Sequence, residues 1–225
     1  MAKVKLLASL ALLLSFFSPV IAVCVGSLPI TCVTSSTDLE TIVNCLDKYT
    51  VTASFYTPAC YNSAQPSAAE IVAWNTAIQS MLTSGCSPGP PEPVPGLLED
   101  YTVTRITDSF GYSFCILSEA KIFADFQVYR RGWGLVVTPA DPVNGAIRDL
   151  HFSAPHPIYD ADTPQQAAAL FRRTQARSLV ITGRHRQAYA IPSACVIPTP
   201  PTVYYKTDAA HDDVSALQMR LYPEA

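Results

Sequence analysis

Three of the four histidines in the chain follow directly on segments that are predicted to be β-strands: His156, His185 and His211. In an open α/β sheet, ligands bind in the crevice outside the carboxyl ends of the strands. Parallel strands would therefore bring these three imidazoles to one edge, where they could hold a metal ion or move a proton. The fourth histidine, His151, lies inside its predicted strand, and we interpret it as a structural or supporting residue.

His156 and Asp160 form an H-x-x-x-D pair across a turn that contains proline. A divalent ion such as Zn²⁺ accepts a histidine nitrogen and a carboxylate oxygen, and a catalytic zinc has about three protein ligands and one open position. With His211 as the third ligand, the sequence predicts a zinc site formed by His156, Asp160 and His211. The alternative is that the pair hydrogen-bonds the turn, with Asp160 or Asp162 serving the start of the next helix.

Arginines flank the second of these histidines, in the order Arg184-His185-Arg186. Arginine holds carboxylate and phosphate groups through two parallel hydrogen bonds, so Arg184 and Arg186 are candidates for binding a substrate carboxylate. Asp208 or His185 would take or return the proton in a metal-assisted hydrolysis. The alternative for the two arginines is a salt bridge to Asp208 or to an aspartate soon after it.

The elements that must position these residues alternate between strand and helix. The pattern predicts a strand from Ile147 to Ala154, a helix from Thr163 to Thr174 with proline at its first turn, and a strand from Ser178 to Thr182. A strand, a helix and a strand within about thirty-five residues form a βαβ unit, whose strands are parallel. A further strand is predicted from Val203 to Thr207, and a last helix is predicted from Asp213 to Leu221.

The region before this unit is rich in β signals. Tyr101 to Ile106 and Tyr112 to Leu117 predict a hairpin, because turn residues separate two β-branched and apolar runs. Ala124 to Tyr129 and Trp133 to Thr138 predict a second hairpin, with its turn at 130–132.

Two helices are predicted nearer the N-terminus. Each begins with a capping box, in which a Ser or Thr and a Glu three residues later satisfy N–H groups of the first turn. The boxes are Thr37 with Glu40 and Ser67 with Glu70, and Gly85 ends the second helix.

The chain has seven cysteines, and five of them lie before residue 90. None has the C-x-x-C spacing of a zinc or redox motif, so in an oxidising compartment they predict disulfides. Because seven is an odd number, at least one thiol is free or pairs outside the chain, and the connectivity stays open. Cys45 lies on the first predicted helix and Cys60 and Cys86 flank the second, so we expect bridges that pin the two helices together.

Four segments follow from these patterns: a signal peptide at 1–22, a Cys-rich helical unit at 23–86, a proline-rich connector at 87–96 and an α/β domain at 97–225. The first segment has two lysines, an apolar run and small residues at its end, as secretory signals do. Its apolar run of about a dozen residues is short for the roughly 20 that a bilayer requires. We expect a secreted, extracellular protein with no membrane contact after cleavage.

Composition narrows the classes of partner. The formal net charge is −3 and there is no basic cluster, which disfavours nucleic acid. The expected partner is a small-molecule or peptide-like substrate, and the oligomeric state stays open. The expected fold class is α/β: a mixed central sheet with flanking helices and a β-hairpin region, preceded by a small disulfide-tied helical unit.

Three sequence motifs carry a resemblance to a known group: APHP-x-x-D, followed by a helix with QAA-x-x-F; ARSL-x-I-x-G-x-HR; and TD-x-AH. Over Trp133 to Asp212 the chain resembles a group of secreted, mostly uncharacterised fungal-type proteins. The Cys-containing N-terminal half resembles them more loosely.

The order of a strand-end His, a nearby acid and a later His is similar, more distantly, to zinc-dependent amidohydrolases and carboxypeptidases of the phosphorylase/hydrolase-like fold. That group includes poly-γ-glutamate hydrolases and N-formylglutamate amidohydrolases. The resemblance implies His156, Asp160 and His211 as zinc ligands and Arg184 or Arg186 on a substrate carboxylate. The chain departs from the pattern because Asp stands where Glu is usual, and the downstream catalytic Glu has no clear counterpart.

Other functions stay open at this point. A non-catalytic secreted interaction protein with a degenerate site is the main alternative to the hydrolase. A histidine phosphatase ranks lower, because its R-H-G-x-R motif requires glycine where Arg186 stands. A serine hydrolase ranks lowest, because the chain has no G-x-S-x-G.

Overall fold

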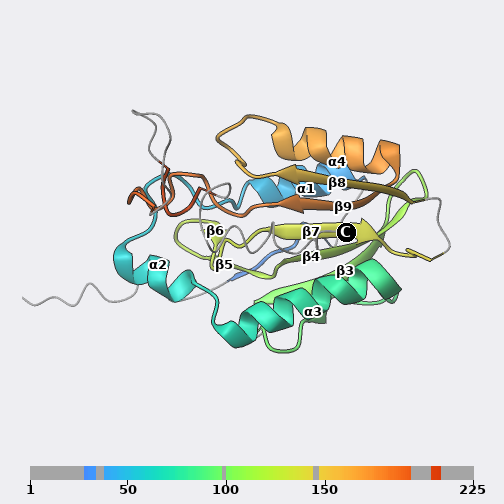
Figure 1. Cartoon of the computed structure of the whole chain (residues 1–225), viewed down its shortest axis with the longest axis horizontal. Coiled ribbons are helices and arrows are strands. Elements are labelled where there is room, and N and C mark those ends of the chain that lie inside the picture. The colour runs from blue at the N-terminus through green and yellow to red at the C-terminus, as the bar shows by residue number, and fades with distance from the viewer. Residues whose placement is uncertain (1–27, 34–37, 98–99, 144–146, 194–203, 209–225) are drawn as a thin grey trace, which may run out of the picture.

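The architecture is a mixed sheet covered by helices on both faces, which confirms the expected α/β class (Figure 1). The structure is a computed structural model, and it describes residues 28–33, 38–97, 100–143, 147–193 and 204–208. The predicted signal peptide lies outside these residues. Within the described chain, no helix has the length and apolar character that a membrane crossing requires.

Nine strands and four helices are assigned in the described part of the chain. The strands are β1 (Leu28–Pro29), β2 (Glu92–Pro93), β3 (Tyr101–Thr107), β4 (Ser113–Glu119), β5 (Lys121–Phe123), β6 (Val128–Tyr129), β7 (Leu135–Pro139), β8 (Arg148–Ala154) and β9 (Ala176–Ile181). The helices are α1 (Leu39–Asp47), α2 (Pro58–Ala64), α3 (Ala68–Ser84) and α4 (Thr163–Thr174). The large sheet has the strand order β2-β3-β4-β7-β9-β8, and a small sheet has the order β1-β5-β6.

The predicted βαβ unit is formed by β8, α4 and β9. The two strands are parallel and pair Phe152 with Leu179 and Ala154 with Ile181. Their carboxyl ends therefore lie at the same edge of the sheet. The further strand predicted at 203–207 is not formed in its described part, where Tyr205 makes only an isolated bridge to Pro192. Proline has no N–H to extend such a ladder.

One predicted hairpin is confirmed and the other is wrong. β3 and β4 pair in an antiparallel register from Tyr101–Glu119 to Thr107–Ser113. β7, however, lies between β4 and β9, and β6 pairs with β5 instead. The reason is burial: Leu135, Val136 and Val137 of β7 are all buried, and a strand that is apolar on both faces belongs at the centre of a covered sheet.

The N-terminal helices pack in the core on the two faces of the sheet. α1 and α4 cover one face of the sheet and α3 covers the other (Figure 1). Leu39 and Ile42 of α1 share a core cluster with Phe171 of α4, and the α3 side chains belong to a second cluster. The proline-rich segment, expected to be a connector, contributes strand β2 to the sheet. Two helices of 9 and 17 residues cannot bury enough apolar surface against each other, so the sheet supplies the partner surface.

The capping signals place the helices correctly where they are described. Ser67 and Glu70 form the predicted capping box, with Ser67 N 2.7 Å from the Glu70 carboxylate, and Gly85 ends α3 with a positive φ of 72°. α1 begins one residue later than its predicted box, because Asp38 accepts the N–H of Thr41 at 2.7 Å. Helix α2 was not predicted.

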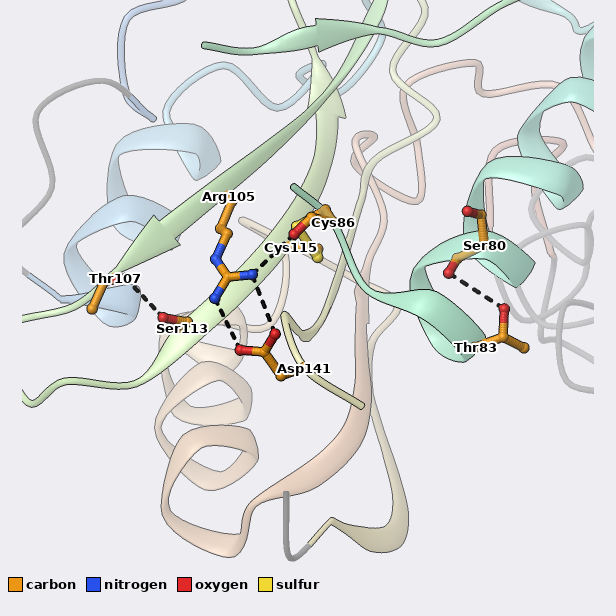
Figure 2. The surroundings of a disulfide bond; sticks show 8 residues. All are labelled: Ser80, Thr83, Cys86, Arg105, Thr107, Ser113, Cys115 and Asp141. Carbon is orange, nitrogen blue, oxygen red and sulfur yellow. Dashed lines mark hydrogen bonds and ion pairs between the residues drawn. A yellow bond between two sulfur atoms is a disulfide. The ribbon is translucent and has the colours of Figure 1, made fainter. Parts of the chain in front are cut away.

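Disulfides fasten the helices to their surroundings. Cys32–Cys45 ties α1 to the segment before it, and Cys86–Cys115 ties the end of α3 to β4 (Figure 2). Cys60 is also disulfide-bonded. The expectation that these bridges pin one helix to another is wrong for the two described pairs, because the helices lie on opposite faces of the sheet.

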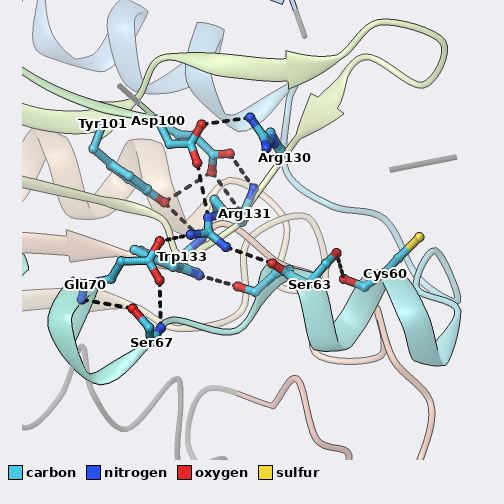
Figure 3. A network of polar contacts seen from close by, with 12 residues as sticks. Cys60, Ser63, Ser67, Glu70, Asp100, Tyr101, Arg130, Arg131 and Trp133 are labelled. Atoms are coloured by element: carbon cyan, nitrogen blue, oxygen red, sulfur yellow. Dashed lines mark hydrogen bonds and ion pairs between the residues drawn. The ribbon is translucent and has the colours of Figure 1, made fainter. Parts of the chain in front are cut away.

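A buried polar network holds α2 and α3 to the sheet through Arg131 (Figure 3). Its guanidinium contacts Glu70 of α3, donates to the carbonyl oxygen of Ser63 in α2 at 2.8 Å, and lies 3.2 Å from Asp100. Trp133 adds a hydrogen bond of 2.6 Å from its indole to an α2 carbonyl. One arginine thus connects two helices with the turn that the sequence predicted at 130–132.

Glu119 is the least accessible acid of this network. It accepts hydrogen bonds from the backbone N–H groups of Arg131 and Gly132, and from the hydroxyl of Tyr101 at 3.2 Å. Burial outweighs these bonds and raises the pKa of Glu119 from 4.5 to about 8.

The raised pKa predicts a pH-dependent free energy of unfolding. Between about pH 4.5 and 8 the folded chain holds a proton on Glu119 that the unfolded chain releases, so stability contributed by this group falls as pH rises. Glu119→Gln removes the titration and should flatten that slope. Urea unfolding of both proteins at pH 5 and pH 8 measures the difference. The exposed substitution Glu92→Gln is the control, and equal pH slopes for wild type and Glu119→Gln would contradict the prediction.

Candidate functional site

His156 lies between two carboxylates just after β8. Its Nδ1 is 3.1 Å from Oδ2 of Asp160, and its Nε2 is 3.0 Å from Oδ1 of Asp208. A neutral imidazole has a single N–H, whereas the imidazolium donates from both nitrogens. The arrangement therefore suits a protonated His156, or an ion in place of the second proton.

Asp208 brings the C-terminal segment to the ends of the parallel strands. Its side chain is 0% exposed, and its Oδ2 lies 2.8 Å from the guanidinium of Arg186. A buried carboxylate is costly unless it is paired. The pairs with His156, after β8, and with Arg186, after β9, therefore tie three distant segments together.

His185 is partly buried beside this cluster. Its Nδ1 accepts the backbone N–H of Gln187 at 3.0 Å, so the neutral ring carries its proton on Nε2. Burial lowers the pKa of His185 below 6.5, and the positive charges of Arg186 and His156 lower it further. At neutral pH this imidazole is therefore a neutral hydrogen-bond donor.

Tyr159 completes the cluster and was missed by sequence reasoning. Its ring makes edge contacts with the rings of His156 and His185, at centroid distances of 6.2 Å and 5.3 Å, and lies 4.9 Å from the guanidinium of Arg186. It is 48% exposed. The sequence did contain one signal for Tyr159, which is its position between the histidine and the aspartate of the H-x-x-x-D pair. The preceding residue, Ile158, has a φ of 55°, which is unusual for a β-branched side chain.

Five of the seven predicted site residues meet at this edge of the sheet. They are His156, Asp160, His185, Arg186 and Asp208. His211 lies outside the described residues.

Arg184 does not join them. It is buried, donates to the carbonyl oxygen of Arg131 at 2.9 Å, and lies over the ring of Tyr56. The expectation that Arg184 binds a substrate carboxylate is therefore not supported by its position. The chain bends at this point, because the N–H of His185 bonds Val51, so the strand alternation that would align Arg184 with Arg186 has ended.

The predicted zinc ligands fit the cluster only in part. Among the described residues, no three His, Cys, Asp or Glu side chains are grouped to hold a metal ion. Asp160 bonds the Nδ1 of His156, the position of a residue that orients a metal-bound histidine. Nε2 of His156 and Oδ1 of Asp208 are 3.0 Å apart, which is a hydrogen-bond distance and is shorter than the roughly 3.4 Å between neighbouring ligands of a tetrahedral zinc ion with bonds of about 2.1 Å. The described residues thus offer two ligand atoms.

His151 stays in its strand, as interpreted from the sequence. Its Nδ1 is 2.8 Å from the hydroxyl of Ser178 on β9, and its Nε2 is 3.6 Å from Asp149. It therefore serves as an internal control for the histidines of the cluster.

Comparisons with protein-family models, with curated proteins and with solved structures find nothing that matches this chain.

Asp208→Asn should destabilise the fold strongly, because it leaves His156 and Arg186 without their shared carboxylate. Breaking a buried ion pair from one side costs about 3–5 kcal/mol of unfolding free energy. Asp160→Asn, which changes the other and 48%-exposed carboxylate on the same histidine, should cost under about 1 kcal/mol. Urea unfolding at pH 7 measures both, and equal losses would contradict the assignment.

The imidazole of His185 should titrate below pH 6.5 in the folded protein. Arg186→Gln should raise the midpoint, because it removes one of the positive charges that lower this pKa. Burial remains, so the return to the ordinary value is incomplete. NMR of the imidazole C–H groups measures the midpoint, with Arg173→Gln on α4 as the control. A midpoint at or above 6.5 in the wild type would refute the interpretation.

Proposed function

We propose that this protein is a secreted, zinc-dependent hydrolase that cleaves an amide bond in a small or peptide-like substrate bearing a carboxylate. The observation that supports the proposal is the placement of His156 between Asp160 and Asp208 at the carboxyl ends of β8 and β9. Ligands of α/β proteins bind at that edge.

The zinc would be held by Nε2 of His156 and Oδ1 of Asp208, with His211 as the third ligand. This assignment changes two expected roles. Asp160 orients the histidine through Nδ1 in place of binding the ion, and Asp208 becomes a ligand in place of the proton carrier. A bound zinc ion would lower the pKa of a water molecule and polarise the scissile carbonyl.

Two further side chains have roles that follow from their hydrogen bonds. His185, with its proton on Nε2, would donate a hydrogen bond to the substrate oxygen that gains negative charge. Arg186, held by Asp208 and covered by the Tyr159 ring, would bind the substrate carboxylate.

Secretion is part of the same proposal. The support comes from the disulfides at Cys32–Cys45 and Cys86–Cys115, since such bonds persist in oxidising compartments, and from the signal-like composition of residues 1–22.

A second candidate is a non-catalytic secreted interaction protein. The observation that favours it is that both ring nitrogens of His156 and both oxygens of Asp208 already have protein partners. These paired side chains would anchor the C-terminal segment to the sheet without any ligand.

Zinc analysis of the purified mature protein separates the two candidates. After dialysis against excess Zn²⁺ and then against buffer, the hydrolase should keep about one zinc per chain by elemental analysis. His156→Ala should lose it, whereas His151→Ala should keep it. A zinc-loaded wild type should also hydrolyse members of a panel of N-acyl amino acids and γ-glutamyl peptides. A folded wild type without zinc at any loading would refute the hydrolase and leave the interaction protein.

A further inference from the structure

A large open cavity of about 800 Å³ lies on the α3 face of the sheet, away from the His156 cluster. Its volume is within the range of about 300–1,000 Å³ that is typical of small-molecule sites. One wall is a face of α3, the other is the segment from Gly85 to Pro95, and the floor is β3.

Both walls are built to keep the space open. Apart from Met81, the α3 side presents small side chains at helical spacing, with Ala73, Ala77 and Ser80 among the lining residues. The opposite wall includes Pro93 and Pro95, whose rings fix φ and supply no N–H donor. The cavity is therefore shaped before any ligand arrives, which lowers the entropic cost of binding.

The proline wall is fastened to the sheet at its start. Cys86 is bonded to Cys115 of β4, and its carbonyl oxygen accepts a hydrogen bond of 3.0 Å from Arg105 of β3 (Figure 2). The same guanidinium is held by both carboxylate oxygens of Asp141, at 3.3 Å and 2.9 Å. Figure 2 shows this arginine between the disulfide and the aspartate.

The side chains that line the cavity carry a net negative charge. Arg105 is the single cation among the described lining residues, and it is already matched by Asp141. Asp141 is 58% exposed and Glu92, on the proline wall, is exposed as well. A ligand that enters thus meets walls in which apolar side chains alternate with serine and threonine hydroxyls, no backbone donor from the prolines, and one carboxylate in excess.

We infer that this cavity binds an elongated apolar cation of the long-chain amine class. The apolar chain fits between the small side chains of α3 and the prolines, and the ammonium group is placed near Glu92 and Asp141. The inference does not depend on the proposed hydrolase, because it uses another face of the sheet and none of the residues of the His156 cluster.

Calorimetric titration with three dodecyl compounds below their micelle concentrations tests the inference on the full mature chain. Dodecylammonium, dodecanol and dodecanoate share one chain and differ in charge. The wild type should bind the amine at one site and about two- to fivefold tighter than the alcohol, as expected for a half-exposed charge pair, with dodecanoate the weakest. In Asp141→Asn, Arg105 loses its carboxylate and the preference should shift to dodecanoate.

Matched variants on α3 show whether the cavity is the site. Ala77→Phe should fill it and reduce affinity for dodecylammonium at least tenfold, and Ser80→Phe, at a more exposed lining position, is the second blocking variant. Val72→Phe changes a residue of the same helix that is 64% exposed and does not line the cavity, so it should bind as the wild type does. Circular dichroism checks folding. Equal binding by folded Ser80→Phe and Val72→Phe, no saturable binding by the wild type, or a wild-type preference for dodecanoate would each overturn the inference.

Discussion

The structure depends on the burial of the central strands β4, β7 and β9 on both faces. Nearly every residue of these strands is buried, so the sheet must be covered by helices on each side. α1 and α4 cover one face and α3 covers the other. The sheet therefore requires the N-terminal helices to cover its apolar faces, and the helices bury their apolar side chains against the sheet.

Two polar clusters connect distant elements of the fold, each at a different place. The Arg131 network joins α2 and α3 to the turn before β7, and the Asp208 cluster joins the C-terminal segment to the ends of β8 and β9. Each is built on a carboxylate or guanidinium that is taken out of water and must find partners on distant elements. Such groups fix which segments meet, whereas apolar contacts tolerate several arrangements of similar volume.

The difference between the clusters lies in their exposure. Arg131 and Glu119 are enclosed by rings and helices, so this network has a structural role. The His156 cluster has Asp160 and Tyr159 at the surface, which gives a ligand access to its edge. Its position also follows from the crossover through α4, which makes β8 and β9 parallel and therefore brings His156 and His185 to the same edge of the sheet.

The sequence by itself determined the local elements and the edge on which the site lies. Periodicity and caps located α3, α4, β3, β4, β8 and β9, because those signals act within a few residues of the chain. The two strands of a βαβ unit are parallel, so their carboxyl ends share one edge, and the sequence predicted His156 and His185 at that edge.

Only the tertiary structure decided the partners. The position of β7 beside β4, the attachment of α1 and α3 to opposite faces, and the separation of Arg184 from Arg186 all depend on which surfaces remain to be buried once the other elements are in place. The same holds for Asp208: the sequence offered it both as a proton carrier and as a salt-bridge partner of the arginines, and the structure buries its carboxylate between His156 and Arg186. Burial and pairing are properties of the assembled chain, and no local pattern of residues encodes them.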